Sequence, residues 1–204
     1  MSNNFEMIGL FPVPILKIKF KDHHKYNFPE VEKRDQKPDD WKIPLQTTFP
    51  FIDDDDPLVP YSIKESLTKD LYHSIVETFE QLNIPTNIEF EQLWYNIYHD
   101  NQGQEIHDHL GGVGNVLLFW SGIYYNKNAT PTTFYREDKI YKTQFFNGCK
   151  KTALHPCLVD SYNPPVEDGD ILLFPPYLTH SFTSEPQHKN GMRMTFSFNI
   201  ALKS

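Results

Sequence analysis

Three histidines in two separate segments form the first group of residues that could bind a metal ion. His107 and His109 are separated by one residue in GQEIHDH, and His180 lies 73 residues after His107 (180 minus 107). Successive side chains of an extended strand point to opposite faces, so His107 and His109 would share a face that excludes Asp108. Such His-x-His pairs are also common at protein surfaces. A strand that returned His180 to the same place would complete a three-histidine metal site.

A polar stripe near the C-terminus could bind an anionic ligand. In residues 192–201, apolar and polar side chains alternate, with Arg193, Thr195, Ser197 and Asn199 on the polar face. On a sheet with one face in water this pattern is ordinary, but inside a small barrel the polar face would line a cavity. The planar guanidinium of Arg193 would then hold a carboxylate, and Thr195 or Ser197 would complete the hydrogen bonds.

The order of these motifs is more specific than any one of them. Gly-x-x-x-His-x-His, a tyrosine-rich strand, the run GDILLFPPYLTH and Arg-x-Thr follow one another between roughly Glu91 and Ala201. This order resembles the iron- and 2-oxoglutarate-dependent oxygenases, and it is most similar to those of marine bacteria and phages, near the prolyl hydroxylases. The resemblance implies a double-stranded β-helix, Fe(II) as the metal and 2-oxoglutarate as co-substrate.

The resemblance also implies roles for single residues. His107 and His180 match the two iron-binding histidines, and Arg193 matches the basic residue that holds the distal carboxylate of 2-oxoglutarate. The metal, rather than a catalytic side chain, would carry out the oxygen chemistry. Further residues that the resemblance places at the co-substrate are Tyr125, Thr195, Ser197, Tyr98 and Asn96.

The third metal ligand departs from the pattern of the family. The usual motif is His-x-Asp, whereas this chain has His109 at the third position and Asp108 one residue earlier. Two histidines and one carboxylate are the usual ligands of such iron sites, and a neutral third ligand would leave the site one unit more positive. A bulge at the strand end could instead turn Asp108 inward. The sequence favours His109 and leaves Asp108 as the alternative.

Short strands dominate the rest of the pattern. Alternating or apolar runs predict strands over 13–20, 88–98, 114–125, 132–136, 170–175 and 192–201. One amphipathic helix is predicted from a capping box at Ser62 and Glu65 to a point before Pro85. We expect a single domain over 1–204, with an N-terminal strand, an irregular loop and the supporting helix in 1–87, and the catalytic core in 88–204. The predicted fold class is mainly β, a double-stranded β-helix of jelly-roll or cupin-like type with one supporting α-helix.

Composition narrows the class of function. The 204 residues carry a net charge of -8, from 19 basic and 27 acidic side chains, which disfavours a nucleic-acid partner. No run approaches the roughly 18 apolar residues of a membrane span, and the N-terminus lacks a secretory pattern. We therefore expect a cytoplasmic protein, in the host cell if a phage encodes it. Two cysteines, Cys149 and Cys157, suit neither a disulfide scaffold nor a zinc site.

These features together predict an iron(II)- and 2-oxoglutarate-dependent oxygenase, most simply a hydroxylase acting on a small molecule or a peptidyl residue. It would use O2 and decarboxylate 2-oxoglutarate to succinate, as the resemblance implies. Two other classes stay open. A cupin-like three-histidine metalloenzyme would have no need of a carboxylate clamp such as Arg193. A non-enzymatic β-sandwich module would give no reason for three histidines and one arginine to converge.

Overall fold

Two antiparallel sheets and one long helix make up the described part of the chain. The computed structural model describes residues 13–110, 117–136, 160–183 and 191–203. The larger sheet has the strand order β1-β8-β5-β10-β3-β2 and the smaller one has the order β4-β9-β6-β7. The strands of the larger sheet are β1 (Leu16–Lys19), β8 (Asp170–Phe174), β5 (Leu118–Lys127), β10 (Arg193–Leu202), β3 (Ile88–Tyr98) and β2 (Gln46–Thr47). Those of the smaller sheet are β4 (Gly103–His107), β9 (His180–Thr183), β6 (Thr133–Tyr135) and β7 (Ser161–Tyr162).

Strand β10 separates the two sides of the larger sheet. It lies between β3 and β5 along nearly its whole length and alternates its side chains between two environments. Met194, Phe196, Phe198 and Ile200 belong to the main apolar core, which also contains the helix. Arg193, Thr195, Ser197 and Asn199 are also buried, on the alternate positions of the strand. The polar stripe of the sequence is therefore inside the protein and not in water.

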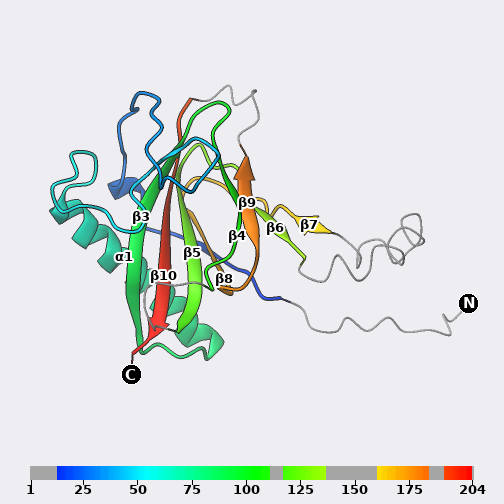
Figure 1. Ribbon diagram of the computed structural model, residues 1–204. Coiled ribbons are helices and arrows are strands. Elements are labelled where there is room, and N and C mark those ends of the chain that lie inside the picture. The colour runs from blue at the N-terminus through cyan, green and yellow to red at the C-terminus, as the bar shows by residue number, and fades with distance from the viewer. Residues whose placement is uncertain (1–12, 111–116, 137–159, 184–190, 204) are drawn as a thin grey trace, which may run out of the picture.

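Helix α1 (Tyr61–Leu82) covers one side of the larger sheet. Its buried stripe is Leu67, Leu71, Ile75 and Phe79, all of them completely inaccessible to solvent. Each such side chain contributes about 1.5–3 kcal/mol of hydrophobic stabilisation. In Figure 1 the smaller sheet lies on the opposite side of the larger one. The helix thus packs on one face of the larger sheet, and a binding site can form on the other face, between the two sheets.

The smaller sheet brings distant segments together by its register. In the pairing of β4 with β9, His107 lies directly opposite His180. The two strands approach so closely that a Cβ on Gly103 would lie 2.5 Å from the carbonyl oxygen of Phe182. Any larger residue there would push the strands apart. Gly103 therefore permits the close approach that places the two histidines side by side.

The predicted fold class is confirmed, because the two facing antiparallel sheets form a double-stranded β-helix with a supporting helix. The predicted strand over 88–98 agrees residue for residue with β3. Of the strand predicted over 114–125, residues 114–116 lie outside the described residues. The prediction of a capping box at Ser62 is wrong. Pro60 is the N-cap, with φ −56° and ψ 157°, and no side chain caps the helix. Within the described residues, no helix has the length and apolar character needed to cross a membrane.

Candidate metal centre and co-substrate cavity

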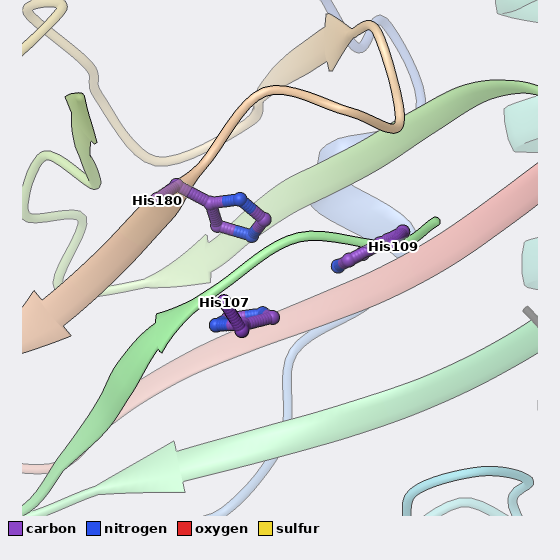
Figure 2. A group of neighbouring side chains, drawn as sticks. All are labelled: His107, His109 and His180. Atoms are coloured by element: carbon purple, nitrogen blue, oxygen red, sulfur yellow. The ribbon is translucent and has the colours of Figure 1, made fainter. Parts of the chain in front are cut away.

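Three imidazole rings converge in the space between the two sheets. His107 ends β4, His109 follows two residues later, and His180 begins β9. Each offers one ring nitrogen, and the three nitrogens lie within 4.8 Å of one another. Figure 2 shows the three rings directed toward a common point. The ring centroids are 4.2 Å apart for His107 and His180, and 5.1 Å apart for His109 and His180.

Hydrogen bonds hold each ring by the same nitrogen, Nδ1. His107 Nδ1 lies 2.7 Å from the carbonyl oxygen of Glu105, and His180 Nδ1 lies 2.9 Å from that of Leu178. A carbonyl only accepts hydrogen bonds, so both Nδ1 atoms carry the proton. His109 Nδ1 lies 2.7 Å from Asn199 Oδ1, which accepts in the same way. All three Nε2 atoms are then unprotonated and have a lone pair for a metal ion.

Burial keeps these imidazoles neutral. It is the largest cause that lowers the pKa of His107, and it lowers the pKa of His109 to about 4. Burial also takes the pKa of His180 well below its usual value, and the two neighbouring imidazoles lower it further. Only neutral imidazole binds a metal ion, so the three rings are in the binding form at neutral pH.

Asp108 points away from this group. Its side chain is exposed, and Oδ1 accepts a hydrogen bond of 3.0 Å from the backbone N–H of Leu110. The backbone N–H of His109 donates to the carbonyl oxygen of Pro176 at 2.8 Å, which ties this residue to the chain just before β9. A register shift does occur in β4 between Gln104 and His107, yet it leaves His107 and His109 on the inner side.

Arg193 lies farther inside, at the start of β10. Only 4% of the residue is exposed, and its guanidinium lies 3.7 Å above the ring centre of Phe182. The rings of Tyr98 and Tyr125 are 4.9 and 5.4 Å away. Nη2 donates to the carbonyl oxygen of Thr130 at 3.2 Å, whereas Nε has no hydrogen-bond partner among the described residues. Burial lowers the pKa of Arg193, and the two tyrosines partly oppose this shift.

The guanidinium has an incomplete set of partners. A buried cation is costly without a counter-charge, and the described residues form no salt bridge with Arg193. A small cavity of about 10 Å³, close to the volume that one water needs, lies between Arg193 and the histidines. Of the remaining co-substrate residues predicted from the sequence, Tyr98, Thr195 and Ser197 line this inner cavity.

Two predicted residues support the inner cavity without being among its lining residues. Asn96 donates through Nδ2 to Ser197 Oγ at 3.1 Å. Tyr125 is completely buried and donates to Thr132 Oγ1 at 2.9 Å. Burial raises the pKa of both tyrosines beside Arg193, that of Tyr98 to about 12. Both hydroxyls are therefore protonated at neutral pH.

Sequence reasoning missed the residues that orient His109 and those that surround it. Asn199 was only a member of the polar stripe, yet its Oδ1 accepts from His109 Nδ1 and from Ser121 Oγ. Gln92 and Ser121 are the cross-strand partners of Asn199 on β3 and β5. A second, larger cavity next to His109 includes residues of the irregular segment before the helix, namely Asp40, Trp41 and Phe49. Periodicity contains no signal for that segment.

The family of this protein follows from a match over more than half of its length. The family model described as "Putative 2OG-Fe(II) oxygenase" matches residues 92–199, which include all three histidines and Arg193. The chain belongs to this family of 2-oxoglutarate- and iron(II)-dependent oxygenases. Iron and 2-oxoglutarate are accordingly its metal and co-substrate, in agreement with the sequence prediction. No curated protein sequence matches the chain.

Solved structures resemble the fold at low sequence identity. HygX from Streptomyces hygroscopicus, with nickel and 2-oxoglutarate bound, has a TM-score of 0.55 and 11% identity, over 93% of this chain and 83% of that chain. A prolyl-4-hydroxylase from Pseudomonas putida has a TM-score of 0.51 and 8% identity, over 94% of both chains. An oxidoreductase of the 2OG-Fe(II) oxygenase family from Burkholderia pseudomallei has a TM-score of 0.46 and 7% identity, over 70% of this chain and 57% of that chain.

The residues of this chain fit the groups that its family uses. Three neutral imidazoles, each held at Nδ1, provide nitrogen ligands of the kind that suits iron, zinc, copper or nickel. Arg193 lines the inner cavity that the histidines also line, and its unpaired Nε could donate a hydrogen bond to a carboxylate.

Proposed function

We propose that this protein is an iron(II)- and 2-oxoglutarate-dependent hydroxylase in which His107, His109 and His180 hold the metal. One observation carries the proposal: three histidines, each hydrogen-bonded at Nδ1, offer ring nitrogens that lie within 4.8 Å of one another, beside a cavity that is also lined by a buried arginine with an unpaired Nε. Bound Fe(II) supplies O2 activation coupled to oxidation of 2-oxoglutarate, so that R–H, O2 and 2-oxoglutarate yield R–OH, succinate and CO2.

The protein's own contribution is to bind and orient. The carbonyls of Glu105 and Leu178 and the amide of Asn199 fix the tautomer of the three histidines, so that every Nε2 faces inward. Arg193 would hold the distal carboxylate of 2-oxoglutarate, with its unpaired Nε as one of the donors. Tyr98 and Tyr125 flank the guanidinium, while Thr195 and Ser197 offer hydroxyls on the same strand.

Binding of 2-oxoglutarate requires movement around Arg193. The inner cavity has a volume of about 10 Å³, and the guanidinium rests against Phe182 at 3.7 Å. A five-carbon dicarboxylate needs more space than one water, so side chains that line the inner cavity would have to move for it to enter. A charge-assisted pair between Arg193 and the carboxylate would offset the contacts that this movement breaks.

The proposal is tested by turnover of 2-oxoglutarate. Purified protein supplied with Fe(II), O2 and 2-oxoglutarate should form succinate slowly even without its substrate, and His180→Ala should abolish this reaction. His73→Ala is the matched control, because His73 is exposed on α1 and far from the site. Succinate formation that survives His180→Ala, or that His73→Ala abolishes equally, contradicts the assignment.

A further inference from the structure

A second cavity adjoins the histidines on the side away from Arg193. It has a volume of about 470 Å³, within the range of small-molecule sites, and we call it the outer pocket. It shares Trp94, Gln104, His107 and His109 with the inner cavity, so a molecule in it would reach the metal centre. The remaining lining residues are Asp40, Trp41, Phe49, Gln92, Glu105, Ile106, Asp108 and Asn199.

Aromatic rings form a continuous wall from the rim of the outer pocket to the metal centre. Trp41 and Phe49 have ring centroids 5.5 Å apart, and Phe49 meets Trp94 edge-to-face at 5.1 Å. Trp94 in turn lies 6.0 Å from His109. Tryptophan is the aromatic residue that attracts an organic cation most strongly, through the negative face of its ring. The wall is therefore suited to a positively charged group.

Three carboxylates give the outer pocket a negative potential. Asp40 and Asp108 are exposed, and Glu105 is half-buried. Glu105 Oε1 accepts hydrogen bonds from the backbone N–H groups of Lys42 and Ile43, which holds the segment carrying Trp41 against β4. No lysine or arginine is among the pocket residues that the structure describes, so the charge of these three side chains has no balancing cation in the described wall.

A chain of amides gives the inner end of the outer pocket a hydrogen-bond donor. His109 Nδ1 donates to Asn199 Oδ1, so the amide nitrogen of Asn199 must donate to Gln92 Oε1. Gln92 therefore has its Nε2 left over, buried and without a partner among the described residues, in a residue that is only 4% exposed. Trp94 Nε1 is a second buried donor with no described partner. An oxygen acceptor on a ligand would satisfy either donor.

We propose that the substrate of this oxygenase is a small organic cation that also carries an oxygen acceptor. The inference rests on the proposed function, since it takes the outer pocket as the place where the substrate meets the metal. The cationic end lies between the aromatic wall and the carboxylates of Asp40 and Asp108. The oxygen, from a hydroxyl, ether or carbonyl group, accepts from Gln92 Nε2 or Trp94 Nε1. The same carboxylates disfavour an anion as the occupant of the outer pocket, whereas 2-oxoglutarate binds in the inner cavity at Arg193.

Choline and its carbon isostere 3,3-dimethylbutan-1-ol are matched probes, because they differ in charge but hardly in shape. Binding is measured on the metal-free full chain by saturation-transfer NMR and by tryptophan fluorescence. Trp41 and Trp94 line the outer pocket, whereas Trp120 packs near Phe79 of α1. We expect choline to bind about 10-fold more tightly than the isostere, which corresponds to roughly 1.4 kcal/mol. The anion 3,3-dimethylbutanoate should bind more weakly than either.

Variants assign the preference to the pocket. In the double variant Asp40→Asn, Asp108→Asn, the preference for choline should fall to about 2-fold, since each partly exposed carboxylate contributes only modestly. The double variant Asp35→Asn, Asp39→Asn is the control, because it removes two negative charges from exposed residues that do not line the pocket. The unmodified protein should bind choline more tightly than tetramethylammonium, which lacks the hydroxyl, and Gln92→Leu should reduce this difference because one of the two donors, Gln92 Nε2, is lost.

The outcomes separate this inference from the proposed function. Equal binding of choline and its isostere, a preference for the anion, or no detectable choline binding overturns the cationic substrate, while succinate formation by the unmodified protein still stands. If the unmodified protein binds choline but forms no succinate, the proposed oxygenase function is overturned and the proposed cation pocket stands. If the choline preference falls as far in Asp35→Asn, Asp39→Asn as in Asp40→Asn, Asp108→Asn, the effect comes from net charge and the pocket assignment is overturned.

Discussion

Replacing Arg193 by lysine keeps a positive charge on β10 and removes the planar pair of donors. Arg193 is 4% exposed, and its described partners are one carbonyl oxygen at 3.2 Å, the ring of Phe182, and the rings and hydroxyl groups of Tyr98 and Tyr125. A lysine ammonium would keep a point charge in the cavity but could not bind both oxygens of a carboxylate in parallel. We therefore expect Arg193→Lys to weaken 2-oxoglutarate binding and to leave metal binding unchanged.

The size of the effect follows from binding linkage. At a concentration 100 times its Kd, 2-oxoglutarate stabilises the folded protein by about 2.7 kcal/mol. For a chain of this length, that raises the Tm of the metal-loaded protein by roughly 5–11 °C. Loss of a charge-assisted hydrogen bond of about 2 kcal/mol raises the Kd about 30-fold. At the same concentration the stabilisation falls to about 0.9 kcal/mol, and the shift to roughly 2–4 °C.

The assay is thermal unfolding of Mn(II)-loaded protein with and without 2-oxoglutarate. Arg34→Lys is the matched control, since Arg34 is exposed and the same substitution there should leave the full shift. The Tm without 2-oxoglutarate and the Mn(II) stoichiometry report whether Arg193→Lys still folds and binds metal. A full shift in Arg193→Lys would refute the carboxylate clamp. No shift in the unmodified protein, together with a shift from another carboxylate, would favour the cupin-like three-histidine metalloenzyme.

Four further predictions concern the metal centre. His107→Ala and His180→Ala should each abolish iron binding by elemental analysis while circular dichroism stays native, and stoichiometric iron in either variant would remove that residue from the ligand set. His109→Ala should impair binding far more than Asp108→Ala, and His109→Asp should retain it; the reverse order would make Asp108 the ligand. Asn199→Ala should weaken metal affinity about 10-fold by calorimetry, because His109 loses its Nδ1 acceptor, and an unchanged affinity would contradict this role. Since burial lowers the pKa of all three histidines below that of free imidazole, all three are unprotonated at pH 7, and Mn(II) binding there should release close to no protons. As the pH falls, binding should weaken at lower pH than free imidazoles would dictate; release of a full proton at pH 7, in calorimetry across buffers, would contradict this prediction.

The amino-acid sequence alone determined the elements and motifs that depend on local patterns. The alternation in residues 192–201 predicted β10, and its polar face contained Arg193 and Asn199 before any contact was known. The spacing of His107 and His109 predicted that they share a face apart from Asp108, and the structure places the side chains in that way. Such patterns are readable because side-chain direction repeats every two residues within a strand.

Only the tertiary structure decided the contacts that join distant segments. The register of β4 with β9 sets His107 opposite His180, and it depends on the close approach at Gly103. Asn199 acquires its role from Gln92 on one neighbouring strand and Ser121 on the other, a relation that no spacing along the chain expresses. The segment with Trp41 and Phe49 has no periodicity, and its place beside His109 is fixed by packing and by the hydrogen bonds to Glu105. Cross-strand register and loop packing depend on the whole fold, which is why His107, His109 and His180 could be proposed from the sequence as metal ligands while the outer pocket required the structure.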